Sequence, residues 1–223
     1  MARIARVVAP DMPHHVTQRG NARAPIFFEP GDESLYLRLL ADQTRRAGVA
    51  IWAYCLMPNH VHLIATPRDE TGLARAIGEA HRRYTAFVNT RAGRTGHLFQ
   101  GRFSSVVMDE DHLIAAARYV CLNPVRARLA KRAEDWPWSS VRAHLGDTSD
   151  PLVSIRPLAD RIDDFAALLR TDPDDPAFAP IRAAETTGRP LGGEAFVADL
   201  ERRLARPLAP RRPGRKAKAD LGK

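Results

Sequence analysis

Residues 55–67, with the sequence C-L-M-P-N-H-V-H-L-I-A-T-P, place a tight turn between two apolar stretches. Pro58 has no backbone N–H and Asn59 tolerates turn dihedral angles, so residues 57–59 can only be a short connection. The stretches on either side, 49–56 and 60–66, are therefore predicted to be the two strands of an antiparallel hairpin. This hairpin requires a fold that contains an antiparallel sheet.

Two histidines follow the turn directly. Successive side chains of a strand point to opposite faces, so His60 and His62 are predicted to lie on one face, with Val61 and Leu63 on the other. Neutral imidazole is a common metal ligand, and a His-apolar-His strand presents two such ligands side by side. In the alternative interpretation His60 merely opens the strand, and His62 is a half-buried polar residue with satisfied hydrogen bonds.

The elements around the hairpin follow a recognisable order. A strand is predicted over 14–19, a helix from Asp32 to the glycine at position 48, a second helix over about 71–89, and a strand ending near Met108. The order β-α-β-β-α-β predicts a ferredoxin-like α+β fold, an antiparallel sheet with both helices on one face. The first and third strands are then the central pair, and the other face is open to substrate or further helices.

A further helix is predicted after Asp109, because three acidic residues in its first turn complement the helix dipole. Leu113, Ala117 and Val120 form an apolar stripe, and Tyr119 falls off that stripe. Asn123 lies four residues later and shares the face of Tyr119. Tyr119 is thus a candidate functional residue on an added helix; the alternative is a packing residue on a second covered face.

The basic residues favour a polyanionic partner. The net charge is +8, and only four of the 34 basic residues are lysines. Arginine forms planar, bidentate contacts with phosphate, as nucleic-acid binding requires, although the codon bias of a GC-rich genome also enriches arginine. Tryptophans can stack on bases or plug the end of a core, and polar residues of the first strand can be solvated edge groups. The candidate DNA contacts are Gln18, Arg19, Asn21, Arg94, Arg102, Arg126, Trp136, Trp138, Arg211 and Arg212.

The composition changes after about residue 146, which divides the chain into a main domain, 1–146, and a C-terminal arm, 147–223. The arm is predicted to contain an acidic, proline-broken linker, a short helix over 194–204 and a disordered basic tail. Cys55 and Cys121 lie in apolar runs, which favours buried thiols in a reducing compartment. No apolar stretch reaches the length of a membrane span. We therefore expect a cytoplasmic protein with no membrane partner.

Two imidazoles and a tyrosine suggest a specific chemistry. A divalent ion held by His60, His62 and Asn123 would act as a Lewis acid on a DNA phosphate. Tyr119 would attack the phosphorus through its phenolic oxygen, and the resulting enzyme–DNA ester would conserve the bond energy for rejoining. The ordinary pKa of tyrosine is about 10, so the phenol needs activation, and the sequence indicates no base.

Three motifs carry a family resemblance: M-P-N-H-V-H-L-I, G-H-L-F-Q-G-R-F and R-Y-V-C-L-N-P-V-R-A. Together they resemble the REP-associated tyrosine transposases, which belong to the HUH-type, IS200-like single-strand transposases. The resemblance extends from about Val8 to Arg142, and T-G-R-P-L-G-G-E-A-F-V resembles the C-terminal segment of that family.

This resemblance implies a ferredoxin-like catalytic domain with Mg²⁺ or Mn²⁺. The implied reaction is cleavage and rejoining of single-stranded DNA beside palindromic hairpins, through a 5′-phosphotyrosine. His60 and His62 match the metal pair and Tyr119 the nucleophile, while Asn123 stands where relatives often place a glutamine ligand. Relatives that form intertwined dimers lack the long arm, so we expect a monomer. Hairpin DNA is the expected partner, with no small-molecule substrate.

Two other functions are consistent with the same residues. One is a catalytically silent, domesticated DNA-binding protein that retains the fold and the arginine surface. The other is a metal-dependent phosphodiesterase that uses an activated water, which would cleave DNA without forming an adduct. Detection of a covalent protein–DNA adduct distinguishes the transposase from both.

Overall fold

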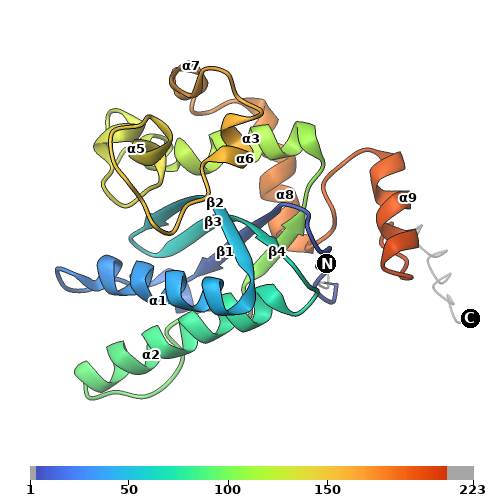
Figure 1. The fold of residues 1–223 in the computed structure, drawn as a ribbon. Helices are drawn as coiled ribbons and strands as arrows, with labels where there is room; N and C mark the ends of the chain where they lie inside the picture. The colour runs from blue at the N-terminus through green and yellow to red at the C-terminus, as the bar shows by residue number, and fades with distance from the viewer. Residues whose placement is uncertain (1–3, 210–223) are drawn as a thin grey trace, which may run out of the picture.

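A four-stranded antiparallel sheet organises the computed structural model, which describes residues 4–209 (Figure 1). The strands run in the spatial order β2-β3-β1-β4, so β1 and β3 are the central pair. This arrangement confirms the predicted ferredoxin-like topology. The strand bounds are His14–Arg19 for β1, Val49–Met57 for β2, His60–Pro67 for β3 and Ser104–Val107 for β4.

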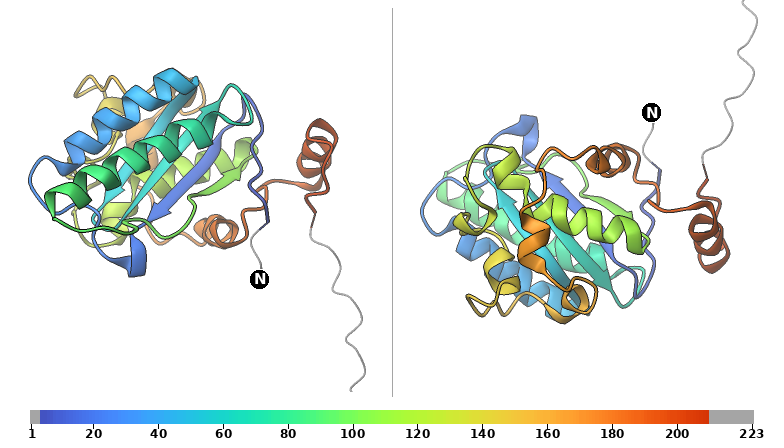
Figure 2. Two further views of the ribbon diagram at one scale, coloured as in Figure 1. Left: turned by 90° about the horizontal axis from the view of Figure 1, so that it is seen from below. Right: turned by 90° about the horizontal axis from the view of Figure 1, so that it is seen from above.

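The first two helices cover one face of the sheet, as predicted (Figure 2, left). Helix α1 spans Asp32–Ala47 and ends at Gly48, whose φ of +66° is a left-handed conformation that glycine adopts without strain. Helix α2 spans Glu79–Arg91 and continues from a π-helical turn, η2, at Ala74–Gly78. Apolar side chains of the sheet and of both helices, among them Val16, Tyr36, Leu63 and Tyr84, form one buried cluster.

Helix α3, Glu110–Cys121, lies across the opposite face (Figure 2, right). Its N-terminus is capped by Asp109, whose carboxylate accepts a hydrogen bond from the backbone N–H of His112. The α3 side chains Leu113, Ala116, Ala117 and Val120 join a second cluster that also contains residues of the C-terminal segment. Because α3 is packed between the sheet and that segment, both of its faces are buried.

Tyr119 is therefore not on an exposed side of α3. The sequence analysis placed this residue off the apolar stripe, and only 6% of its surface is exposed in the structure. Its ring instead contacts Phe178, which comes from the C-terminal segment. The second face of α3, which the sequence analysis considered as an alternative, is thus covered as well.

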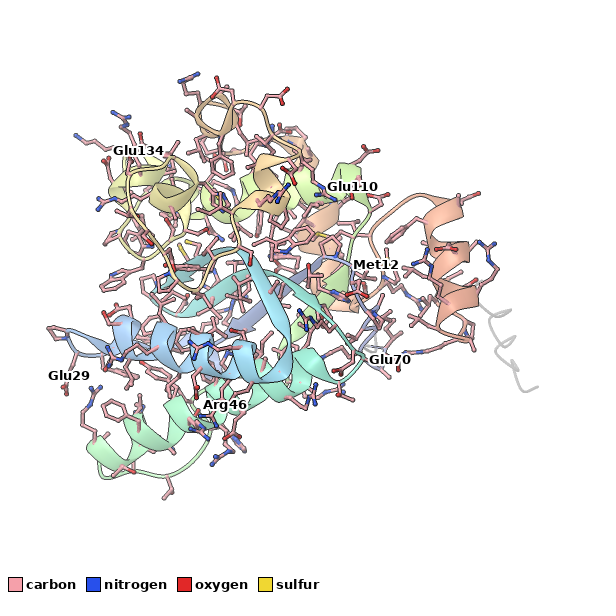
Figure 3. The ribbon with its side chains drawn as sticks, viewed as in Figure 1. Met12, Glu29, Arg46, Glu70, Glu110 and Glu134 are labelled. Atoms are coloured by element: carbon pink, nitrogen blue, oxygen red, sulfur yellow. The ribbon has the colours of Figure 1, made fainter. Side chains whose placement is uncertain are left out.

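Short helices follow α3 and wrap over it. Arg161, just beyond α6, forms an ion pair with Glu110 in the first turn of α3, with 2.7 Å between Nε and Oε2 (Glu110 is labelled in Figure 3). The bounds are Asn123–Arg126 for α4, Val141–His144 for α5, Arg156–Ala159 for α6, Phe165–Leu169 for α7, Ala179–Thr187 for α8 and Glu194–Arg203 for α9, with 3₁₀ turns at Asn21–Arg23, Ala133–Asp135 and Pro176–Phe178.

Helix α8 lies beside the sheet edge formed by β4. The Ser104 hydroxyl donates a 2.8 Å hydrogen bond to the backbone oxygen of Glu185, and Ile181 of α8 joins the cluster around α3. Helix α9 lies at one side of the molecule, near the N-terminal segment, where Leu200 packs with Val7 (Figure 1). The sequence predicted the helix over 194–204 but none over 179–187. Within residues 4–209, no helix combines the length and the apolar composition that a membrane span needs.

Candidate active site

His60 and His62 project from β3 toward α3, on the face of the sheet opposite to α1 and α2. In the sheet register His62 lies between Thr17 of β1 and Cys55 of β2, and His60 is paired with Arg19. The two imidazole centroids are 4.9 Å apart, with ring planes at 78°. The alternation of the strand thus brings the two predicted histidines together on one face.

A third histidine joins them from β1. Nε2 of His15 lies 3.0 Å from Nδ1 of His62, and the two rings stack with 7° between their planes. Oε1 of Glu185, on α8, lies 3.8 Å from Nδ1 of His15 and 3.9 Å from Nδ1 of His62. Over residues 4–209, His15, His62 and Glu185 form the one group of His, Cys, Asp or Glu side chains whose ligand atoms are spaced to hold a metal ion, all within 4.8 Å of one another.

The histidines at this site are neutral. Burial lowers the pKa of His60 to about 4, with a further lowering from the charge of Arg19, and burial lowers the pKa of His15 to about 3. Burial, together with nearby positive groups, places the pKa of His62 well below its usual value. A neutral imidazole has one N–H donor and one nitrogen lone pair, so each ring can offer one nitrogen to a cation.

The hydrogen bond of His60 fixes which nitrogen that is. Nδ1 of His60 lies 2.6 Å from Oδ1 of Asn59, whose amide nitrogen donates to the backbone oxygen of Arg23. Since Oδ1 can only accept, Nδ1 of His60 carries the proton and Nε2 carries the lone pair. A hydrogen bond from the other ring nitrogen commonly orients a metal-ligating histidine in this way.

Buried nitrogens without hydrogen bonds mark the same place. Nε2 of His62 and Nδ1 of His15 are buried and have no hydrogen-bond partner among the described residues. An unsatisfied buried polar atom costs free energy, and a bound cation would remove that cost for an imidazole lone pair. A set of imidazole nitrogens and a carboxylate fits Mn²⁺, and Mg²⁺ if waters complete its shell. The residues present therefore fit a divalent ion.

Tyr119 reaches this group from α3. The centroid of its ring lies 5.5 Å from that of His62 and 5.8 Å from that of His15. Arg126 of α4 lies over the same ring, with its guanidinium carbon 4.6 Å from the centroid. Side chains of β1, β3, α3 and α4, from segments distant in sequence, thus lie together.

The surroundings of Tyr119 act on its phenol in opposite directions. Burial raises the pKa of Tyr119, and the negative charge of Glu185 raises it further. A hydrogen bond from Arg126 and the positive charge of that residue lower it. Arg126 therefore favours the phenolate form of Tyr119.

A cavity of about 460 Å³ opens beside the histidines. Three of the predicted DNA-contacting residues, Gln18, Arg19 and Arg102, line it together with His60, His62 and Glu185. Tyr119 is not among its lining residues, although its ring packs edge-on against that of His62, which does line the cavity. The cavity combines cationic side chains with the candidate metal ligands, which suits a phosphate group.

The other predicted residues do not line this cavity. Asn123, at the start of α4, is buried, and its amide nitrogen has no hydrogen-bond partner among the described residues. Asn21 is exposed in the turn after β1. Arg94 is exposed after α2 and lies over the ring of Phe28. The ligand role of Asn123 and the DNA contacts of Asn21 and Arg94 stay predictions.

The two tryptophans are held by the core. The indole N–H of Trp136 donates a 2.9 Å hydrogen bond to the backbone oxygen of Leu56, and Trp138 packs against the cluster under α1 and α2. Both are partly buried. Their stacking on bases stays a prediction, as do the contacts of Arg211 and Arg212, which lie outside the described residues.

Sequence reasoning missed His15 and Glu185. The strand alternation contained a signal for His15: once β1 pairs with β3, His15 and Thr17 lie on the face of His62. No comparable signal existed for Glu185, because its position depends on how α8 packs beside β4. A carboxylate from the C-terminal segment therefore completes a site otherwise formed by the first 126 residues.

Two solved structures are similar to this chain. A solved structure of a REP-associated tyrosine transposase bound to a REP hairpin is similar over 70% of this chain and 90% of its own, with a TM-score of 0.56 and 18% identity. A crystal structure of a protein from Deinococcus radiodurans R1 covers 53% of this chain and 95% of its own, with a TM-score of 0.38 and 19% identity. No curated protein matched the sequence significantly.

The first of these structures shows that this chain has the fold of a REP-associated tyrosine transposase. The sequence itself matches the family described as IS200-like transposases over residues 9–123, just over half of the chain. That stretch contains His15, His60, His62 and Tyr119. The chain therefore belongs to the family of IS200-like transposases.

Proposed function

We propose that this protein is a REP-associated tyrosine transposase, which cleaves and rejoins single-stranded DNA beside a hairpin through a covalent tyrosine intermediate. The family membership supports a transposase that acts on DNA, and the similar solved structure is bound to a REP hairpin. The observation that carries the finer proposal is the meeting of the Tyr119 ring with the rings of His62 and His15, at 5.5 and 5.8 Å.

The protein's own residues account for the covalent step. The phenolic oxygen of Tyr119 attacks the phosphorus, the bond from phosphorus to the 3′ oxygen breaks, and the products are a 5′-phosphotyrosine and a free 3′-hydroxyl. The negative charge of Glu185 raises the pKa of the Tyr119 phenol, and burial raises the pKa of Glu185 itself to about 7. We assign Glu185 to receive the phenolic proton and to pass it to the departing 3′ oxygen, because its carboxylate lies 3.9 Å from Nδ1 of His62, whose ring contacts that of Tyr119.

A divalent cation, Mg²⁺ or Mn²⁺, completes this proposal. Nε2 of His60 and Nε2 of His62 are the nitrogens that would hold it, with His15 and Asn123 as further donors or orienting groups. When bound, such an ion supplies Lewis-acid stabilisation of the negative charge on the phosphate oxygens. Arg19 and Arg102, in the same cavity, would hold the neighbouring phosphates.

We further propose that the protein acts as a monomer in the cytoplasm. Both cysteines, Cys55 and Cys121, are buried free thiols, which suits a reducing compartment. The packing of Leu158, Phe165 and Ile181 on the same cluster as α3 supports one chain forming the whole site. The division at residue 146 stays a prediction.

The test uses hairpin oligonucleotides with single-stranded flanks, taken from beside the protein's own gene, incubated with and without Mn²⁺. A covalent adduct that survives denaturing gel electrophoresis and appears only with the cation is the expected result. Cleavage without an adduct would indicate hydrolysis by water instead. Binding with neither cleavage nor adduct would indicate a DNA-binding protein without catalysis, a second candidate that the burial of Tyr119 away from the cavity favours.

A further inference from the structure

A second cavity, of about 430 Å³, lies on the opposite face of the sheet from the histidines. It is bounded by the first turns of α2 and by the loop at residues 97–103 that leads into β4. Gln18 and Arg102 line both this cavity and the one beside His60 and His62. The two cavities therefore meet at the end of β1, where β4 no longer pairs with it.

Aromatic rings form much of the wall of the second cavity. Phe99 and His81 pack together with ring centroids 4.4 Å apart, and Phe103 lies under the guanidinium of Arg6, 3.6 Å from its centroid. Burial lowers the pKa of His81 to about 3, and its Nε2 is hydrogen-bonded to the Tyr36 hydroxyl, so the ring is neutral. Flat uncharged rings beside arginines suit an aromatic ligand that carries a phosphate.

The helix that forms one side of the cavity has a glycine, Gly78, in the cavity wall, so no side chain fills the cavity at that position. Gly78 has helical angles, φ −60° and ψ −43°, and a Cβ placed there would meet nothing within 4 Å. Glycine in the interior of a helix destabilises it relative to alanine, so the helix gives up stability at this point. The π-helical turn Ala74–Gly78, a feature frequent at functional sites, contributes two residues to the wall.

We propose that this second cavity, the base pocket, holds one nucleobase of the DNA strand whose neighbouring phosphate lies at His60 and His62. The inference rests on the proposed function, because it takes single-stranded DNA as the ligand. An unpaired base can turn out of a flexible strand and stack on aromatic rings, while its backbone follows cationic side chains. Arg102 and Gln18 stand where the backbone would pass from one cavity to the other.

Gly78→Leu tests the base pocket, because leucine favours the helix and its side chain fills the space that Gly78 leaves. The matched control is Ala86→Leu, which adds a leucine to an exposed position of the same helix that does not line the pocket. The ligand is the cleavable hairpin oligonucleotide, prepared intact and with a single abasic site at each position near the scissile phosphate. Affinity is measured by fluorescence anisotropy.

For the wild-type protein, one abasic position should weaken binding about tenfold, as expected for the loss of one stacked base. Gly78→Leu should weaken binding of the intact oligonucleotide by a similar factor, and the abasic site should then cause no further loss. Ala86→Leu should behave as the wild type. Thr85→Leu, which narrows the same pocket, should give the same result as Gly78→Leu. It is used in place of Gly78→Leu if the thermal unfolding midpoint of Gly78→Leu falls below that of the wild type.

Wild-type affinity and an unchanged abasic profile in both pocket variants would overturn the inference. In that case the wild type would still form the covalent adduct, so the proposed function would stand. If the wild type forms no adduct with any oligonucleotide, the proposed function is wrong instead. The base pocket is then also wrong, unless one abasic site still weakens binding to the wild type and causes no further loss in Gly78→Leu.

Discussion

Nε2 of His15 on β1 lies 3.0 Å from Nδ1 of His62 on β3, and the two imidazoles are stacked. Both rings are neutral, so one nitrogen of the pair donates and the other accepts. If Nδ1 of His62 donates, its Nε2 carries the lone pair, as Nε2 of His60 does, and Nδ1 of His15 faces Glu185. His15 is then the residue that orients His62 rather than a ligand itself.

His15→Gln tests this role. Loss of a group that orients a metal ligand typically lowers metal affinity by about 10–100-fold, so adduct formation should need correspondingly more Mn²⁺ and recover at saturation. The measurement is adduct yield against Mn²⁺ concentration. His14→Gln is the control, since His14 is equally buried but hydrogen-bonds to the backbone of Met12 and Ala9. An unchanged midpoint in His15→Gln would argue against the orienting role.

Tyr119→Phe should abolish the covalent adduct and leave hairpin binding within about twofold, because only the attacking oxygen is removed and the ring contacts with His62 and Phe178 remain. Denaturing gels report the adduct and anisotropy reports the binding. Tyr84→Phe is the control: it removes a buried hydroxyl that donates to the Ile26 backbone oxygen, in the cluster on the other face of the sheet. An adduct formed by Tyr119→Phe would exclude Tyr119 as nucleophile.

Arg126→Ala should slow adduct formation by about tenfold or more at neutral pH. Its guanidinium lies over the Tyr119 ring and lowers the pKa of the phenol, so its loss raises that pKa and moves the rate profile to higher pH. Single-turnover rates from pH 6 to 10 measure the shift. Lys131→Ala, an exposed charge change just beyond α4, should leave the profile in place. A uniform rate loss without a shift would assign Arg126 to DNA binding alone.

Acid should destabilise the metal-free protein. Three buried histidines and one partly buried histidine have pKa values of about 3 to 4 in the folded state and about 6.5 when unfolded, so below pH 6.5 the unfolded chain binds more protons and stability falls. They are His14, His15, His60 and His81. Glu185 acts with the opposite sign, because its pKa of about 7 when folded favours the folded state as pH falls toward 4.5.

The destabilising contribution of the four histidines exceeds the stabilising contribution of the one carboxyl. The free energy of unfolding should therefore fall by on the order of 4 kcal/mol between pH 7 and pH 5. Urea unfolding in EDTA at the two pH values measures it. Glu185→Gln should enlarge the loss, since it removes the opposing contribution. Equal stability at both values would show that these histidines titrate normally.

The part of the site that the sequence predicted depends on contacts between neighbouring residues of the chain. Strand alternation alone placed His60 and His62 on one face, and the turn at Pro58 fixed the hairpin that carries them. Family resemblance singled out Tyr119, because helical periodicity also allowed a packing residue on a second covered face, and the structure does bury that face. The partnership of His15 needed the register between β1 and β3, and Glu185 needed the packing of α8; both depend on contacts between distant segments.

The position of α8 affects how relatives should be compared. The stretch shared with the family ends at residue 123, whereas Glu185 and Phe178, which lie beside His15 and Tyr119, come from beyond it. Family members can thus keep the same histidines and tyrosine while exchanging the wall that encloses them. Differences in rate, metal preference or choice of strand among such enzymes should therefore be sought first in the region where their sequences no longer align.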